Sequence, residues 1–177
     1  MIATNKSKVI IISIFIIVIF LGGSIFHVHE AYAEMKIVAG TSKLLKRLIT
    51  TNETYPDQTR VRFINTLQMY SSADPDWDKA KVFSVSYSIN PTHDGDPYNG
   101  CLAITHHNGD QTFIKYDGSW KWALPKDGLS WISESKGKFT GGTGKFEGIS
   151  GTFTVTVEGR GPSHYVSSKW EVEYEIK

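Results

Sequence analysis

The chain has 177 residues and a mass of 19.8 kDa, which leaves no room for two domains of ordinary size, so we expect one. Its 19 basic and 18 acidic residues give a formal net charge of +1, which excludes the strong basic field of a nucleic-acid-binding protein. The single cysteine excludes an internal disulfide framework and a multi-cysteine zinc site.

Residues 1–33 have the features of an export signal. Lys6 and Lys8 form a positive segment, and the almost wholly apolar run Val9–Leu21 follows it. Ala31-Tyr32-Ala33 then gives the small-x-small pattern of a cleavage site. The pattern predicts a secreted or periplasmic protein that has no membrane segment after cleavage. An uncleaved N-terminal anchor that leaves the protein facing outside is the alternative, because the apolar stretch is near the lower length limit of a spanning helix.

Residues 34–59 are the least regular part of the remaining chain. Four apolar residues fall on one face at helical spacing: Leu44, Leu45, Leu48 and Ile49. Thr41 is a suitable N-cap, so the spacing predicts a short helix over Thr41–Thr51. Met35–Val38 is compatible with a first strand instead. We therefore expect residues 34–59 to form an N-terminal extension with this helix.

From Arg60 onward the hydrophobic period changes to two, which is typical of half-buried strands. The apolar faces of the first two strands contain Val61, Phe63, Leu67, Met69, Phe83, Val85, Tyr87 and Ile89. The predicted strands are Arg60–Tyr70, Lys81–Asn90, Gly100–His107, Gln111–Tyr116, a segment around Trp120–Trp122, Ser130–Thr140, Gly151–Glu158 and Ser168–Ile176. No helical block separates them, so the pattern predicts an all-β fold. A sandwich and a barrel both fit. Closure removes exposed edges and favours a single antiparallel barrel of about eight strands over residues 60–177.

A glycine-rich segment, residues 141–151, follows one predicted strand and leads into the next. Its residues are Gly141, Gly142, Thr143, Gly144, Lys145, Phe146, Glu147, Gly148, Ile149, Ser150 and Gly151. Glycine permits sharp corners and close backbone approach, so we expect a structural role, with Phe146 and Ile149 pointing inward at a barrel end. The spacing does not fit a phosphate-binding loop, and no βαβ context supports a dinucleotide site, so no cofactor is expected.

This segment resembles the GGTGxFxGxxG signature of allene oxide cyclase-like and dirigent-like β-barrels, and the resemblance extends over roughly Val82–Ile176. The hairpin around Asn108-Gly109-Asp110 is also similar to those proteins. The resemblance implies an eight-stranded antiparallel barrel with an apolar interior. In that family the barrel either cyclises an oxylipin or guides the coupling of phenoxy radicals. No catalytic residue of either branch matches a position in this chain.

An eight-stranded barrel is either filled by side chains or holds one small ligand, and large aromatic residues suit both arrangements. The candidates for lining a cavity are Tyr87, Trp120, Trp131, Glu134, Trp170 and Tyr174. Among these, Glu134 is the candidate for an inward polar group. The residues Glu171, Glu173 and Glu175 alternate with apolar ones, so we expect them to face water.

The other chemistry-bearing residues suggest structural positions. Adjacent His106 and His107 point to opposite faces of a strand, so they do not share a metal ion, and we expect surface or rim histidines and no metal site. Cys101 is predicted to be a buried thiol. The loop around Asp94-Gly95-Asp96 leaves a weak calcium site open.

Three functions remain open. The leading hypothesis is an exported, non-catalytic protein that binds a small apolar or amphipathic molecule inside the barrel. The second is a cofactor-free isomerase or cyclase, which the resemblance implies. The third is a protein-binding module, such as an inhibitor of a secreted enzyme, that uses the loop Asn90–Gly100.

Overall fold

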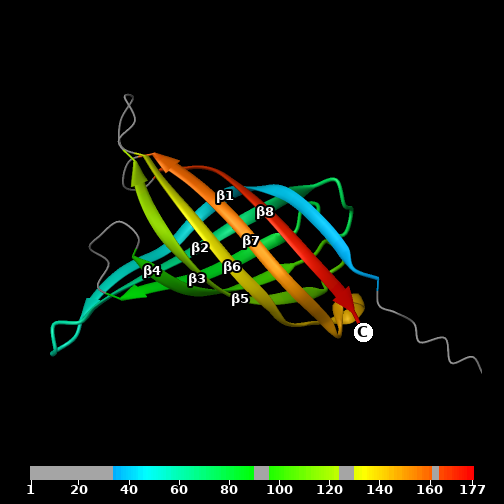
Figure 1. Cartoon of the computed structure of the whole chain (residues 1–177), viewed down its shortest axis with the longest axis horizontal. Coiled ribbons are helices and arrows are strands. Elements are labelled where there is room, and N and C mark those ends of the chain that lie inside the picture. The colour runs from blue at the N-terminus through cyan, green and yellow to red at the C-terminus, as the bar shows by residue number, and fades with distance from the viewer. Residues whose placement is uncertain (1–33, 90–95, 124–129, 161–163) are drawn as a thin grey trace, which may run out of the picture. The chain divides into compact units, whose positions relative to one another are not determined.

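A computed structural model describes residues 34–89, 96–123, 130–160 and 164–177, and within these ranges it shows a closed antiparallel β-barrel of eight strands (Figure 1). The strands are β1 (Lys36–Thr54), β2 (Arg60–Ser72), β3 (Lys81–Ile89), β4 (Pro97–Thr105), β5 (Gln111–Ala123), β6 (Ser130–Gly142), β7 (Ile149–Arg160) and β8 (His164–Ile176). Each strand pairs with the next, and β8 pairs with β1. This confirms the predicted all-β barrel. The predicted export signal lies outside the described residues.

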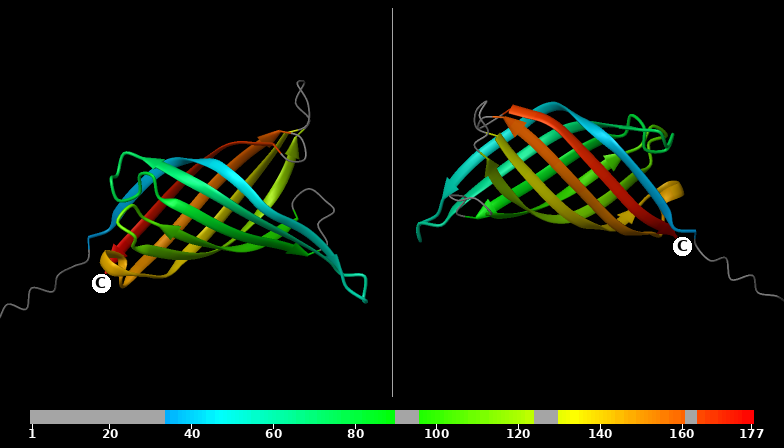
Figure 2. Two further views of the ribbon diagram at one scale, coloured as in Figure 1. Left: turned by 180° about the vertical axis from the view of Figure 1, so that it is seen from behind. Right: turned by 45° about the horizontal axis from the view of Figure 1, so that its top comes forward.

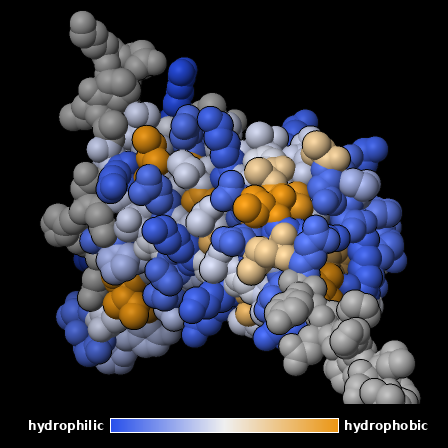
Figure 3. Space-filling model, turned by 45° about the vertical axis from the view of Figure 1, so that its right-hand side comes forward, coloured by the Kyte–Doolittle hydropathy of each residue, from blue (hydrophilic) through white to orange (hydrophobic). Residues whose placement is uncertain are grey.

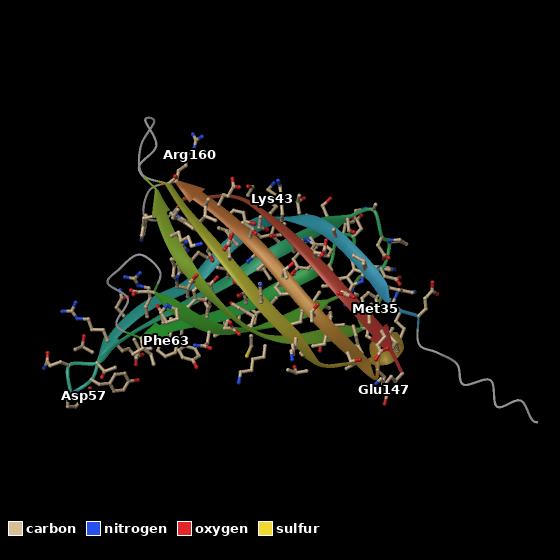
Figure 4. All side chains as sticks on the ribbon, viewed as in Figure 1. Met35, Lys43, Asp57, Phe63, Glu147 and Arg160 are labelled. Atoms are coloured by element: carbon tan, nitrogen blue, oxygen red, sulfur yellow. The ribbon has the colours of Figure 1, made fainter. Side chains whose placement is uncertain are left out.

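The only helical element in the described ranges is the 3-10 turn η2 (Gly144–Phe146), and no helix there has the length and apolar character needed to cross a membrane. The two ends of the barrel are marked by Asp57, in the β1–β2 hairpin, and by Glu147, directly after η2 (Figure 4).

The prediction of a helix over Thr41–Thr51 is wrong, because this segment belongs to the long strand β1. The pairing of β1 with β2 shifts its register between Leu44 and Lys46 and again between Arg47 and Ile49. Each bulge inserts a residue and breaks the period of two, so apolar residues in a bulged strand take a spacing like that of a helix. The barrel therefore begins at Lys36 and not at Arg60.

One end of the barrel is closed by packed aromatic rings. Trp77 lies in the loop between β2 and β3 and is fully buried, at 0% exposure. Its ring centroid lies between 4.9 and 6.2 Å from those of His106, Phe139, Phe146, Trp170 and Tyr174. Phe146 and Ile149, both predicted to point inward, are buried here. We call this cluster the closed end.

The turn that carries Phe146 is held to this closed end by hydrogen bonds. Gly144 has a φ of +57°, and a Cβ there would lie 2.0 Å from Oδ1 of Asp110. The other carboxylate oxygen of Asp110 accepts the backbone N–H of Lys145 at 3.1 Å. The Lys145 ammonium group pairs with Asp76 in the Trp77 loop. The glycine-rich segment thus brings a backbone turn, a carboxylate and the Trp77 loop together.

His106 is buried in the closed end, so the prediction of a surface or rim histidine is wrong for this residue. Its Nδ1 donates to the backbone carbonyl of Asp76 at 2.8 Å, and its Nε2 lies 3.2 Å from the hydroxyl of Thr112. The ring also stacks on Phe146 at 4.1 Å. Both nitrogens are satisfied by a neutral ring, and burial lowers the pKa of His106.

The buried ring predicts a loss of stability in mild acid. Because the folded-state pKa of His106 lies below the unfolded value of about 6.5, the unfolded chain takes up the proton first as the pH falls. The free energy of unfolding should therefore be highest above pH 6.5 and decrease below it, through the lowered folded-state pKa. Urea unfolding across this range measures the effect. His106→Gln should remove much of the dependence, whereas His107→Gln, at the exposed neighbour, should keep it. Equal pH profiles in both variants would contradict this assignment.

In β3 the serines point into the barrel and the large apolar residues point outward, which is the reverse of the expected arrangement. Val82 is buried in the barrel interior, where it lines the cavity described below, and the period of two then turns Ser84, Ser86 and Ser88 inward as well. The expectation that the apolar face of this strand is buried is wrong. Phe83 is 41% exposed and Ile89 is 55% exposed.

Cys101 has the same outward direction, because it pairs with Val85 across the β3–β4 ladder. Its thiol is exposed, so the prediction of a buried cysteine is wrong. Figure 3 shows another side of the barrel, whose surface is mostly hydrophilic with several separate hydrophobic groups. The row Glu171, Glu173 and Glu175 points away from the buried Trp170, Val172 and Tyr174, as predicted.

Candidate ligand-binding cavity

The barrel interior contains a cavity of about 110 Å³ to which all eight strands contribute side chains. Its apolar lining comes from Leu44, Ile64, Val82, Leu102, Trp120, Trp131, Phe153, Val155 and Val157. Its hydroxyl and amide groups come from Ser42, Thr66, Gln68, Tyr70, Ser84, Ser86, Tyr98, Tyr116, Ser133, Ser135 and Tyr165. The interior is therefore apolar in area but contains many hydrogen-bonding groups, as is usual for sites that bind small organic molecules.

Two tyrosines of the lining are fixed by serines on other strands. The hydroxyl of Tyr98 on β4 bonds to Ser133 and Ser135 on β6. The hydroxyl of Tyr116 on β5 lies 2.9 Å from Ser84 on β3. Burial raises the pKa of Tyr98 and raises that of Tyr116 to about 12, so both phenols are protonated at neutral pH. They can hydrogen-bond to a ligand, but they do not supply a base.

A second polar group lies where β1, β2 and β8 meet. The hydroxyl of Ser42 donates to Oε1 of Gln68 at 2.7 Å and also contacts Ser168. The hydroxyl of Tyr165 donates to the backbone carbonyl of Ser42 at 2.8 Å. These bonds hold Gln68 and Tyr165 in the lining, so the polar side of the cavity is preorganised.

The aromatic rings of the lining lie across glycines on neighbouring strands. Tyr98 pairs with Gly118, Tyr116 with Gly100 and Trp131 with Gly159. A Cβ at Gly118 would lie 2.6 Å from both Cζ and the hydroxyl oxygen of Tyr98. The missing side chains let the rings lie flat along the wall, so the cavity stays open. A glycine opposite an aromatic residue on the neighbouring strand indicates that the ring lies along the wall. This pattern could not be used from the sequence alone, because it requires knowing which residues pair across the strands.

Arg47 is the cationic residue of the lining, and it is exposed, so the cavity reaches the surface beside it. Among the described residues, no carboxylate forms an ion pair with Arg47. Its guanidinium group is therefore available to a ligand that carries an anion or a strong hydrogen-bond acceptor.

The predicted cavity residues fall into three groups. Trp120 and Trp131 line the cavity. Trp170 and Tyr174 are buried in the closed end, where Trp170 donates its indole N–H to the carbonyl of Thr41 at 2.9 Å. Neither of these two lines the cavity.

The prediction is wrong for Tyr87 and Glu134, which lie on the outer surface. Tyr87 is 40% exposed and alternates with the inward serines of β3. Glu134 lies between the inward Ser133 and Ser135, so the alternation of β6 turns it outward. Its carboxylate is 3.7 Å from the ammonium group of Lys121. The cavity lining therefore contains no carboxylate among the described residues.

Comparison of the chain with known protein families, curated proteins and solved structures finds no match. Within the described ranges, no three His, Cys, Asp or Glu side chains come close enough to hold a metal ion. The side chains of His93, His164, Asp94 and the nearby loop lie outside the described residues. The cavity is thus the feature on which a functional proposal rests.

Proposed function

We propose that the protein is an exported carrier that binds one compact amphipathic molecule inside its barrel and does not alter it chemically. The observation that carries the proposal is the cavity of about 110 Å³, with its aromatic wall, its fixed hydroxyls and Arg47. A closed cavity of about 150 Å³ is known to hold benzene, so this smaller cavity, which opens to the surface beside Arg47, suits at most one small ring or a short chain with part of the molecule at the opening.

The distribution of polar groups supports an amphipathic ligand over a purely apolar one. The rings of Trp120 and Trp131, 5.3 Å apart, offer apolar contact to a flat group. Arg47 offers a charge-assisted hydrogen bond where the cavity reaches the surface. An aryl carboxylate, with its ring inside and its anion beside Arg47, fits both features.

The absence of a base from the described lining supports binding over catalysis. Acid–base chemistry needs a group whose pKa lies near the working pH. Burial raises the pKa of Tyr98, and it raises the pKa of Tyr116 to about 12, so neither phenol meets this condition. The isomerase alternative keeps one supporting observation, which is that Tyr98, Ser133 and Ser135 form a fixed group of hydroxyls in the cavity wall that a ligand oxygen can join. Incubation of bound ligand followed by chemical analysis tests for turnover.

A calorimetric titration with two matched ligands tests the proposal. We expect phenylacetate to bind with a saturable isotherm, and we expect Arg47→Gln to weaken phenylacetate more than the neutral analogue 2-phenylethanol. Val157→Trp fills the cavity and should lower the affinity at least about tenfold, since ligand and side chain compete for the same space. Thr154→Trp, which points outward on the same strand, should leave binding unchanged.

Two results would contradict the proposal. One is the absence of saturable binding for both ligands. The other is an equal effect of Val157→Trp and Thr154→Trp. The export part of the proposal is tested separately, by the N-terminal sequence of the protein recovered from its own host, which should begin at Glu34.

A further inference from the structure

The outer surface of β2 and β3 is apolar except for Asn65, which lies at its middle opposite Val85. We call this surface the apolar face and define it by eight residues: Val61, Phe63, Leu67, Met69, Phe83, Val85, Tyr87 and Ile89. These two strands lie toward the viewer when the barrel is seen from behind (Figure 2, left), and Phe63 is labelled at the margin of the barrel in Figure 4. Phe83, Tyr87 and Ile89 are each at least 40% exposed.

The register arranges these residues in cross-strand pairs. Leu67 pairs with Phe83, Phe63 with Tyr87 and Val61 with Ile89. The rings of Phe63 and Tyr87 have centroids 6.3 Å apart. The next strand, β4, adds the small residues Ala103 and Cys101 beside Phe83 and Val85. The apolar face therefore continues sideways onto β4 without a bulky or charged interruption.

The size of this surface suits a protein–protein interface. From the strand rise and the strand spacing, the two strands of the apolar face cover about 27 by 10 Å, or roughly 270 Å². A standard interface buries about 800 Å² on each partner, of which about 57% is non-polar. The apolar face thus supplies somewhat more than half of the non-polar area that one partner needs, and Ala103 and Cys101 on β4 add to it. The largest apolar patch on a monomer is often a functional surface.

The charges at its two ends are opposite in sign. At one end, Lys43 and Lys81 flank Met69 across the ladder. At the other end, Glu53 flanks Val61. Neither lysine forms an ion pair among the described residues. A second copy turned about a two-fold axis perpendicular to the strands would bring each lysine end against the partner's glutamate end.

We propose that the apolar face binds the same face of a second copy of this chain and forms an antiparallel two-fold dimer. Such an interface is self-complementary, since each copy offers the same apolar centre and both charged ends. An anionic membrane is a poorer fit, because Glu53 and Asp117 lie on the same side of the barrel as the lysines. The proposal does not depend on what the cavity binds.

Sedimentation velocity of the protein, purified from cells that express the full chain, tests the proposal over a wide concentration range. We expect a dimer at high concentration. Tyr87→Lys, at the centre of the apolar face, should weaken the dimer at least about tenfold, because it buries a charge in the interface. Ile132→Lys, at an exposed apolar residue on β6, is the matched control and should leave the dimer unchanged. Circular dichroism and urea unfolding show whether both variants fold.

A charge exchange tests the orientation of the two copies. Glu53→Lys places like charges together and should weaken the dimer, and adding Lys81→Glu should restore it. The exposed Cys101 gives an independent readout, since its reaction with a thiol reagent should slow as dimer forms. At the usual separation of about 10 Å between packed sheets, the two thiols are too far apart for a disulfide.

Three outcomes would overturn the proposal. The first is a monomer at every concentration, and the second is a dimer that Tyr87→Lys and Ile132→Lys affect equally. The third is a monomer that binds anionic phospholipid vesicles in a manner lost in Tyr87→Lys, which would assign the apolar face to a lipid surface.

Discussion

Replacing Trp77 with alanine is expected to destabilise the protein by about 3–5 kcal/mol, the range for removing a fully buried tryptophan from a packed core. Trp77 has no exposed surface and contacts five other rings. The rings around it on β6 and β8 are held by their own strands, so they fill little of the space that it leaves. The loss should appear in urea unfolding as a lower midpoint with little change in slope.

Two matched variants separate this effect from that of losing any tryptophan. Trp77→Phe keeps a ring and also removes the indole N–H, which is buried with no hydrogen-bond partner in the described structure. Its cost should therefore stay below about 2 kcal/mol. Trp122→Ala, at a residue that is 40% exposed, should cost less than about 1 kcal/mol. A loss for Trp77→Ala as small as that for Trp122→Ala would show that the closed end is not the main source of stability.

The second large effect is expected for Gly118→Ala. The new methyl group would lie 2.6 Å from the backbone oxygen of Glu134 and equally close to the ring of Tyr98. The ring must then leave its position, and its hydroxyl loses Ser133 and Ser135. Overpacking together with the lost hydrogen bonds should cost about 2–4 kcal/mol.

Urea unfolding measures this loss of stability, and calorimetry with phenylacetate measures whether the displaced ring blocks the cavity. The control is Ser119→Ala at the next position, which should change stability by less than about 0.5 kcal/mol. Equal stabilities for the two variants would mean that the ring of Tyr98 has space to move, and the cavity would then be adaptable rather than fixed.

The β-barrel was predictable because alternation and turn residues are local signals. The direction of each alternation was not predictable locally. The sequence of β3 is compatible with either Phe83 or Ser84 inside, and the buried position of Val82 in the barrel interior decides between them. The wrong expectation for Tyr87 followed from that choice. The position of Cys101 depends on the same register, through its pairing with Val85.

The cavity was harder to predict than the fold. Trp120 and Trp131 were predictable as interior aromatic residues, but Trp170 and Tyr174 carry the same signal and fill the closed end instead. Which ring lies in which half depends on how far each strand is staggered around the barrel. The sequence did not indicate that Arg47 lines the cavity. This residue lies between the two bulges of β1, where the alternation of inward and outward residues is interrupted.

Under the proposed function, the ligand contacts come from side chains spread over eight strands, and most of these side chains lie outside the ring cluster around Trp77. Substitutions at Leu102 or Val157 would change the shape of the cavity away from the rings around Trp77, whereas Val155 pairs with Trp170 and would affect both. Under the proposed function, single mutations in the lining would therefore be enough to change which small molecule the barrel prefers. The same separation makes this chain a practical scaffold for selecting binders to new compounds.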